Sequence, residues 1–204
     1  MYAPHVIRRF VLVGRIASAS GDFLLDDVPG TSGRLDVLLR AIRAALLSSH
    51  GIRHDTVLDL VLLQGPRVVR IEGATVHFLR PDERSLAVLL KKVLTSGVDD
   101  APGFSRFRRG ISLARGGLEV SLADLPSGGL FVLDEGAPLD LRDAEIAPGD
   151  ATFVLGDHLG LPDDVLAELD AAGARRVTIG PVSVHADDAV AIVVNELDRR
   201  SVRA

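Results

Sequence analysis

The segment 153–165, FVLGDHLGLPDDV, passes from an apolar run into a glycine-flanked turn and then toward a helix that begins with PDDV. Gly156 and Gly160 enclose Asp157 and His158 within this turn. A strand that turns through glycine into a helix offers free backbone N–H groups and lets a ligand approach closely. The turn is therefore either a backbone cradle for a ligand or an ordinary turn with a capping aspartate and an exposed histidine.

A second loop of the same kind follows further along the chain. In TIGPVSVHADD, residues 178–188, a strand ends at Gly180 and Pro181, and a loop with Ser183 and His185 leads into a helix. Two glycine-containing loops at strand ends favour a binding site over an isolated turn.

Strands and helices alternate along the rest of the sequence. Residues 8–16 and 56–64 have the apolar, β-rich pattern of strands, and residues 31–51 have the spacing of a helix that Thr31 or Ser32 caps and Gly51 ends. This order predicts a βαβ unit. We further expect, in chain order, a hairpin at 68–79, a helix at 81–97, a loop at 98–109, short strands within 110–126, 129–139 and 152–160, a helix at 162–173, a strand at 175–181 and a final helix at 187–200.

The short strands indicate the fold class. Three short apolar strands, each followed by a turn, predict a parallel sheet whose carboxyl ends collect at one edge, where ligands bind. The 204 residues are enough to bury a core without disulfide bonds. Because the sequence contains no internal repeat and no low-complexity tract, we expect one compact α/β domain over residues 1–204.

Composition excludes several functional classes. The chain has no cysteine, which excludes disulfide bonds, thiolate metal sites and cysteine catalysis. No segment reaches the length of a membrane span, and the first apolar run is too short for a signal sequence, so we expect a cytoplasmic protein with no membrane partner. The formal net charge of −5 argues weakly against a general nucleic-acid coat protein. Local arginine clusters could still line a groove for an anionic polymer, and they are Arg8 with Arg9, Arg40 with Arg43, Arg67 with Arg70, Arg106 with Arg108 and Arg109, Arg175 with Arg176, and Arg199 with Arg200 and Arg203.

Known catalytic and metal motifs are absent. A metal site would have to combine His158 and His185 with Asp157 or Asp187, but their spacing gives neither a helical HxxxH pair nor a facial triad, so we expect no metal. The sequence contains no G-x-S-x-G elbow and no P-loop. A pocket built largely from backbone remains, which suits a nucleoside or an adenosyl cofactor.

Four segments together resemble a known family. They are RRFVLVGRIASASGDFLLDDVPGTSGRLDVLLRAIRAALLSSHGIRHD at 8–55, PDERSLAVLLKKVL at 81–94, LGDHLGL at 155–161 and IGPVSVHADDAVAIVVNELDRR at 179–200. In order and spacing they are similar to the archaeal tRNA pseudouridine-54 N1-methyltransferases and their bacterial relatives. The resemblance extends over nearly the whole chain, and the GDF, LGDHLG and HAD motifs make it specific.

The resemblance implies a fold, a cofactor and its contacts. The fold would be the SPOUT methyltransferase fold, a parallel sheet flanked by helices with a C-terminal trefoil knot, in a homodimer that binds S-adenosylmethionine (SAM). The cofactor contacts implied are Leu133, Leu155, Gly156, Ile179, Gly180, Pro181, Val182, Ser183, Val184 and Ala189. This interpretation favours the backbone cradle for the segment 153–165, with His158 ordering the loop or meeting the other subunit.

The implied reaction is the transfer of a methyl group to N1 of pseudouridine in RNA, at position 54 of the tRNA T-loop. Asp22 in SGDF is the first candidate for contacting the base, and its alternative role is to cap a turn after Gly21. Arg34 lies at a predicted helix N-terminus and is assigned an RNA-binding or base-orienting role, with a salt bridge as its alternative. For the RNA phosphates we expect Arg8, Arg9, Arg106, Arg108 and Arg109 to act before the C-terminal arginines.

Two departures from the family pattern leave the substrate open. This chain has SVHADDA where archaeal members usually have SYHADHC, so Val184 and Ala189 replace a tyrosine and a cysteine. The backbone cradle should survive both changes, whereas packing on the cofactor and contact with the base could change. The alternatives are a ribosomal RNA pseudouridine as the substrate, or a module that binds the adenosyl cofactor or RNA without catalysis.

Overall fold

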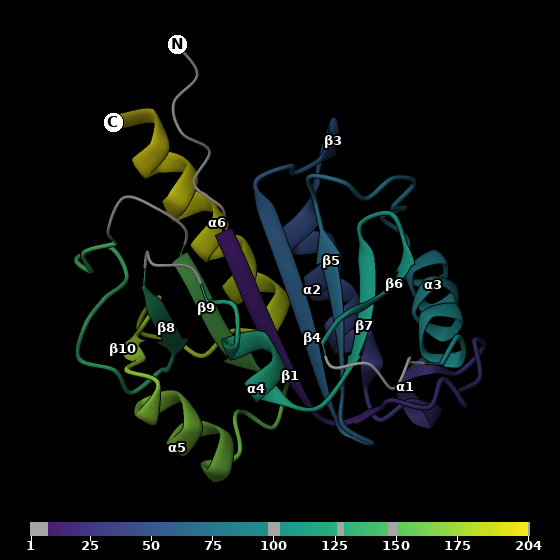
Figure 1. The fold of residues 1–204 in the computed structure, drawn as a ribbon. Coiled ribbons are helices and arrows are strands. Elements are labelled where there is room, and N and C mark those ends of the chain that lie inside the picture. The colour runs from purple at the N-terminus through teal and green to yellow at the C-terminus, as the bar shows by residue number, and fades with distance from the viewer. Residues whose placement is uncertain (1–7, 98–102, 126–128, 147–150, 204) are drawn as a thin grey trace.

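An eight-stranded sheet organises the protein in the computed structural model, which describes residues 8–97, 103–125, 129–146 and 151–203 (Figure 1). Across the sheet the strand order is β10-β8-β9-β1-β4-β5-β7-β6. These strands are β1 (Arg8–Ser18), β4 (Thr56–Gln64), β5 (Arg67–Glu72), β6 (Ser105–Arg108), β7 (Ile111–Arg115), β8 (Leu130–Leu133), β9 (Ala151–Gly156) and β10 (Arg175–Val177). From β10 to β4 neighbouring strands run parallel, whereas β5, β7 and β6 pair antiparallel.

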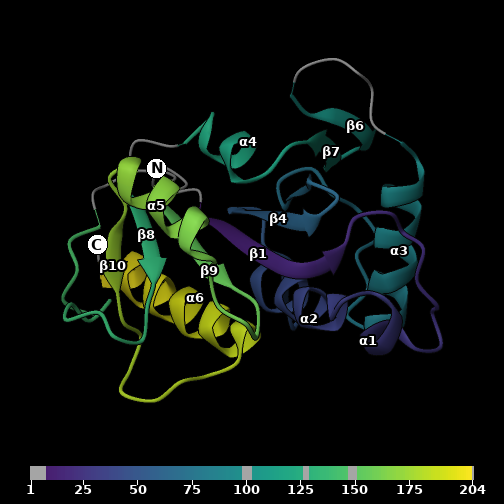
Figure 2. The same ribbon diagram turned by 90° about the horizontal axis from the view of Figure 1, so that it is seen from below.

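Helices cover both faces of this sheet (Figure 2). They are α1 (Val28–Thr31), α2 (Leu35–Leu46), α3 (Glu83–Thr95), α4 (Leu118–Leu122), α5 (Asp163–Ala171) and α6 (Ala186–Arg203), and a small separate sheet pairs β2 (Leu47–Ser48) with β3 (Gly51–Ile52). Strand β1 shows why both faces need cover. Phe10 and Leu12 join the core under α2, α3 and α6, whereas Val11 and Val13 join the core under α4 and α5. A strand that is apolar on both faces is typical of the centre of a parallel sheet.

The predicted βαβ unit is confirmed. Strands β1 and β4 are parallel neighbours, and α2 connects them. The helices expected at 81–97, 162–173 and 187–200 appear as α3, α5 and α6, and the strand expected at 175–181 begins as β10. The expected α/β class with a parallel sheet is therefore correct.

The predicted hairpin at 68–79 is wrong. Strand β5 ends at Glu72, and its hairpin partner is β4, which reaches it through a turn at Gly65, whose φ is +92°. Beyond Glu72 the chain forms a turn in which the Val76 N–H donates to the Glu72 carbonyl at 2.9 Å. Val76 is buried in the core and pairs with no strand, so its apolar character reflects packing and not a second hairpin strand.

Three further boundaries differ from the sequence predictions. The first of the three short strands, β7, pairs antiparallel with β5 and so does not belong to the parallel part of the sheet. The segment expected to be a loop at 98–109 contains β6, while residues 98–102 lie outside the described residues. The helix expected at 31–51 extends only from Leu35 to Leu46, because Arg34 is left-handed and Leu47 is extended.

The trefoil knot stays a prediction. The end of β10 lies between β8 and the segment 139–141, since β10 pairs with β8 and Thr178 bridges to Asp140. The connection from β8 to β9 includes residues 147–150, which the structure does not describe, so the path of the chain around β10 is not traced. None of the helices in the described ranges is long and apolar enough to cross a membrane.

Candidate functional site

A cavity of about 1000 Å³ lies at the carboxyl ends of β8, β9 and β10. Loops that follow these strands form its walls, and α2 and α6 close it. Its lining consists of Arg34, Val37, Arg40, Val132, Leu133, Asp134, Glu135, Gly136, Leu155, Gly156, Asp157, His158, Gly160, Leu161, Leu166, Thr178, Ile179, Gly180, Val182, Ser183, Val184, His185, Ala186, Asp188 and Ala189. A cavity of this size is at the upper end of the range for ligand pockets, roughly 300–1,000 Å³.

Most of the predicted cofactor residues meet at this cavity. Leu133, Leu155, Gly156, Ile179, Gly180, Val182, Ser183, Val184 and Ala189 line it, whereas Pro181 does not. They come from three loops and one helix that are far apart in sequence, and the parallel strand order gathers them at one edge. Their contact with a cofactor stays a prediction.

Asp157 holds the turn that follows β9. Its side chain is buried, and its two oxygens accept hydrogen bonds at 2.8 Å from the Arg15 and Leu159 N–H groups. Its own N–H donates to the Val13 carbonyl at 3.0 Å, which ties the turn to β1. Asp157 therefore acts as the capping aspartate of the ordinary-turn interpretation, in a turn that also forms a wall of the cavity.

Gly156 and His158 have different places in the same turn. A Cβ on Gly156 would lie 2.4 Å from the backbone carbon of Gly160, so the turn closes only with glycine at this position. The His158 ring is partly exposed, and its Nδ1 lies 3.8 Å from Asp157 Oδ1. The histidine thus borders the cavity without a close partner for proton transfer in the described structure.

The loop after β10 is anchored on both sides. The Thr178 N–H donates to the Leu139 carbonyl at 2.8 Å, and the Thr178 carbonyl accepts from Leu141 N–H at 2.8 Å. Further on, the Ser183 hydroxyl donates to the Glu135 carboxylate across the gap between the loops after β10 and β8. These contacts fix the loop backbone, while Val182 stays exposed at the rim.

Arg34 approaches the cavity from the start of α2. Its φ is +66°, which lies in the left-handed region. This conformation is energetically unfavourable for a residue other than glycine, and residues that adopt it are often found at functional sites. The preceding Gly33 is also left-handed, and a Cβ there would lie 1.8 Å from the Ile16 carbonyl oxygen. Asp36 accepts hydrogen bonds from Arg34 Nε at 2.9 Å and Nη2 at 3.1 Å, so the salt bridge named as the alternative role of Arg34 is present. Of this pair, Arg34 lines the cavity.

Asp36 also accepts a hydrogen bond from Arg40 Nη1 at 3.0 Å. Burial by itself would raise the pKa of Asp36, but the hydrogen bonds from Arg34 and Arg40 outweigh it and lower the pKa. The hydrogen bond between Arg34 and Asp36 in turn raises the pKa of Arg34. The rim of the cavity therefore carries two arginines whose guanidinium groups are oriented by one ionised, buried carboxylate.

Asp36→Asn is expected to lower the free energy of unfolding by about 1–3 kcal/mol at pH 7, because two arginines lose a charge-assisted acceptor. Because the pKa of Asp36 is lower in the folded protein than in the unfolded chain, its ion pairs with Arg34 and Arg40 stabilise the fold fully at pH values above the ordinary carboxyl pKa. This stabilisation is lost as the pH falls through the pKa that Asp36 has in the folded protein. Denaturant unfolding at several pH values checks this. The difference between wild type and variant should shrink toward pH 3, and a constant difference would contradict it. Asp26→Asn, at an exposed pair, is the control.

Asp22 does not reach the cavity. Its side chain is exposed, and the neighbouring Gly21 packs against Thr95 and Lys91 at the end of α3. Within one chain Asp22 is therefore not among the residues that line the cavity, whereas Arg34 and most of the predicted cofactor residues are.

Two of the five arginines proposed for phosphate binding are structural. Arg8 and Arg9 are predicted to contact phosphates from the N-terminal part of the chain, and both lie in β1, within the strand predicted at 8–16. Arg8 is buried and pairs with Asp55 at 3.2 Å and Asp198 at 2.5 Å. Arg9 pairs with Asp124 at 2.9 Å, and its side chain is 11 % exposed. The prediction is wrong for these two, since each is held in place by a carboxylate. Arg106, Arg108 and Arg109 lie in or directly after β6.

Several residues that line the cavity were not predicted from the sequence. Asp134 and Glu135 follow β8 directly in FVLDEG, so the rule that ligands bind beyond the carboxyl ends of parallel strands could have identified them. Arg40 and Asp188 lie within helices, and no local pattern marks them. In the ranges that the structure describes, no group of three His, Asp or Glu side chains is arranged to hold a metal ion.

A parallel sheet with a cofactor-sized cavity at its carboxyl edge is the arrangement in which open α/β proteins bind nucleotide-like ligands, and this protein is of that class. Residues 7–202 match the model of the family described as "Putative SAM-dependent RNA methyltransferase", and the chain belongs to this family. It is 37% identical over 196 residues to the tRNA (pseudouridine(54)-N(1))-methyltransferase of Methanosarcina acetivorans, covering 95% of this chain and 92% of that protein. The enzyme of the same name from Halobacterium salinarum is 40% identical over 195 residues, with coverage of 94% and 96%.

A solved structure supports the fold. The crystal structure of Archaeoglobus fulgidus Nep1 bound to S-adenosylhomocysteine superposes with a TM-score of 0.63 at 14% identity, covering 95% of this chain and 97% of that one. The expected SPOUT-type α/β architecture is therefore correct.

Proposed function

We propose that this protein transfers the methyl group of SAM to N1 of pseudouridine in tRNA, at position 54 of the T-loop. Its relatives at 33–40% identity are named for this activity, and they match it over most of their length. The observation that carries the proposal is the gathering of the predicted cofactor loops and Arg34 around one cavity.

The residues of the cavity fit SAM. Loops after three strands offer backbone groups for an adenosine, and a Cβ on Gly180 would meet no atom within 4 Å, so the loop leaves open space there. Asp134, Glu135 and Asp188 supply carboxylates beside a cofactor that carries a sulfonium and an ammonium group. Leu133, Leu155 with Gly156, and the loop 179–184 would hold it, and the bound cofactor supplies an already activated methyl group.

Arg34 is the side chain of this chain best placed to act on the base. In methylation, N1 of pseudouridine would release its proton to solvent and form the bond to the methyl group, while the bond from that methyl group to sulfur breaks and S-adenosylhomocysteine leaves. As the proton departs, negative charge develops on the ring and its carbonyl oxygens. A guanidinium fixed by Asp36 can stabilise that charge or hold a neighbouring phosphate without reorganising. The remaining requirement is alignment of donor and acceptor, which a rigid loop cavity provides.

A homodimer is part of the proposal. Exposed apolar side chains at Val182 and Val184 line the cavity, Leu159 is exposed in the turn that follows β9, and a second copy would cover all three. Asp22 could then contact the base only from the partner subunit. We also propose that residues 1–204 form one domain with a knotted C-terminal part, which the family match over 7–202 supports, and that the protein works in the cytoplasm on tRNA.

A paired methylation assay tests the proposed function. Labelled SAM is offered to two otherwise identical tRNAs, one with pseudouridine and one with uridine at position 54. We expect label only in the pseudouridine tRNA, as N1-methylpseudouridine, because uridine has no free N1–H. Label in neither tRNA, with SAM binding intact, would overturn the tRNA assignment. Ribosomal RNA with pseudouridine is then the next substrate, and a failure there as well would leave a module that binds without catalysis.

A further inference from the structure

A second, smaller groove lies at the opposite edge of the sheet. Its volume is about 380 Å³, and it is lined by Phe78, Arg80, Asp82, Arg84, Ser85, Leu86, Val88, Leu89, Lys92 and Arg108. These residues come from the segment before α3, from α3 itself and from the end of β6. Strand β6 is the edge strand farthest from β10, so the groove is separate from the cavity at β8, β9 and β10.

Phe78 is held in an unusual position at this groove. Its side chain is 92% exposed, whereas the other phenylalanines of the described residues are buried or partly buried. Its φ is +57°, a left-handed value that is a genuine outlier for a bulky residue. Val76 and Leu79 on either side are buried in the core. The chain is thus anchored on both sides of Phe78, and the aromatic ring is turned outward at a cost in backbone energy, as is typical of functional positions.

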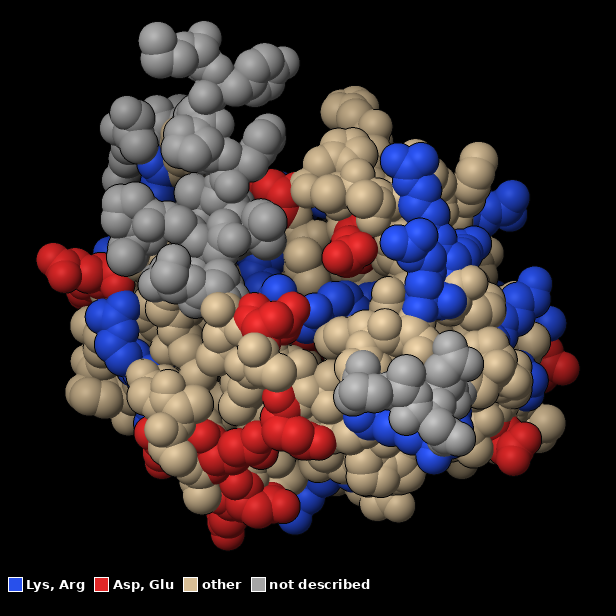
Figure 3. Space-filling model, in the orientation of Figure 1, with Lys and Arg blue, Asp and Glu red and all other residues tan. Residues whose placement is uncertain are grey.

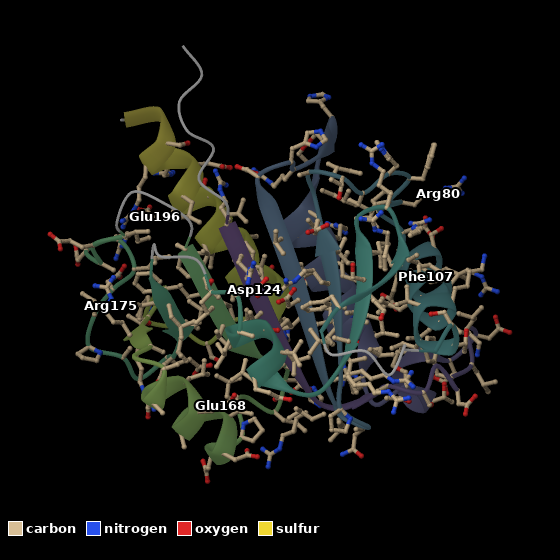
Figure 4. All side chains as sticks on the ribbon, in the orientation of Figure 1. Arg80, Phe107, Asp124, Glu168, Arg175 and Glu196 are labelled. Atoms are coloured by element: carbon tan, nitrogen blue, oxygen red, sulfur yellow. The ribbon has the colours of Figure 1, made fainter. Side chains whose placement is uncertain are left out.

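Cationic side chains share the groove with Phe78. Among the described residues, Arg80, Arg84, Lys92 and Arg108 line it together with one carboxylate, that of Asp82. The Asp82 carboxylate accepts a hydrogen bond from the Ser85 N–H at 2.8 Å and caps the N-terminus of α3. This carboxylate is therefore engaged by the helix backbone. Arg108 Nε is buried without a hydrogen-bond partner among the described residues. Figure 4 shows Arg80 at the outer rim of the molecule, beyond β6 and α3.

Acidic and basic side chains are unevenly distributed on the face of the molecule that Figure 3 draws. Figure 3 shows acidic side chains gathered at the lower left, over α5, and basic side chains over the region of β6, β7 and α3. Although the net charge of the chain is −5, the groove end is therefore locally positive. Such a distribution directs a polyanion to the groove end of the molecule.

We propose that this groove binds a single-stranded part of the tRNA, with one unpaired base stacked on Phe78 and the adjoining phosphates on Arg80, Lys92 and Arg108. Proteins recognise looped RNA by stacking unpaired bases on aromatic rings and by neutralising phosphates with arginine and lysine. The proposal rests on the proposed function for the identity of the RNA. Because the groove and the cavity of one chain lie at opposite ends of its sheet, the stacked base is a different nucleotide from the one that the same chain methylates.

Phe78→Ala tests the stacking contact. We expect its dissociation constant for pseudouridine-54 tRNA to rise about tenfold, within the range that loss of one stacked base produces. Phe78→Trp should restore the wild-type value, since it keeps a stacking face. The SAM dissociation constant, the melting temperature and kcat at saturating tRNA should stay at their wild-type values, because the ring is exposed and lies outside the cavity.

Arg80→Ala tests the phosphate contact, with Arg43→Ala on the exposed side of α2 as the matched control. We expect Arg80→Ala to reduce the slope of log affinity against log salt by about 0.7–0.9, which corresponds to one phosphate contact, and Arg43→Ala to leave it unchanged. Equal slopes for wild type and Arg80→Ala would overturn the phosphate part of the proposal.

The two proposals fail in different ways. If Phe78→Ala binds and methylates the tRNA with wild-type dissociation constant and KM, the groove proposal is wrong and the proposed function stands. If wild type binds tRNA through Phe78 but transfers no methyl group to pseudouridine, the groove proposal stands and the proposed function is wrong.

Discussion

Gly156→Ala is expected to weaken SAM binding by roughly 10- to 100-fold, because overpacking a close-packed site costs about 1–3 kcal/mol and about 1.4 kcal/mol corresponds to tenfold in affinity. The added Cβ would lie 2.4 Å from the carbonyl carbon and 2.7 Å from the carbonyl oxygen of Gly160. Both neighbours are backbone atoms of the same turn, so no side-chain rotation relieves the contact. The turn must open, and it moves the wall that Leu155 and Gly156 form in the cavity. Titration calorimetry with SAM measures the loss.

Gly51→Ala is the matched control for this variant. Its Cβ would meet no atom within 4 Å, and it lies in β3, outside the cavity. We expect this control to bind SAM like wild type. If Gly156→Ala also binds SAM with the wild-type dissociation constant, the turn 156–160 does not hold the cofactor, and the backbone cradle must lie in the loops after β8 and β10.

Asp59→Ala is expected to lower the free energy of unfolding by about 3–5 kcal/mol, the cost of leaving a buried cation without its partner. Asp59 is fully buried in β4 and accepts Arg70 Nε and Nη2, each at 2.7 Å. Arg70 also donates to Asp124 at 2.5 Å and lies 4.0 Å from the centre of the Phe104 ring. Asp124 lies in front of the sheet in Figure 4, at the end of α4. The melting temperature should fall by about 10 °C.

Two further variants separate a lost ion pair from a lost side chain. Asp26→Ala removes a carboxylate from an exposed pair with Arg84, and we expect it to change stability by less than about 1 kcal/mol. Asp59→Leu combined with Arg70→Met removes both buried charges and should recover most of the stability lost in Asp59→Ala. A loss below about 1 kcal/mol in Asp59→Ala would contradict the expectation and indicate that Asp124 alone is sufficient for Arg70.

Local patterns predicted the parallel core well. The apolar run of β1 and the helix spacing of α2 gave the βαβ unit, and glycine turns at strand ends marked the loops after β9 and β10. Predictions failed where distant residues decide the outcome. The hairpin at 68–79 looked regular in sequence, but Val76 packs into the core and β7 takes the place beside β5. Arg8 and Arg9 looked accessible because their partners, Asp198 and Asp124, are more than a hundred positions away.

The α/β class, the family resemblance and the glycine turns after β9 and β10 could be predicted from the sequence alone, because periodicity and turn residues are local properties. The tertiary structure was needed to show which charged residues are free to act. It placed Arg34 on the cavity and Asp22 away from it, and it paired Asp59 with Arg70 inside the sheet. It also turned Phe78 outward between two buried neighbours. Burial and ion pairing depend on which distant segments meet, and that information is spread over the whole chain and absent from any short motif.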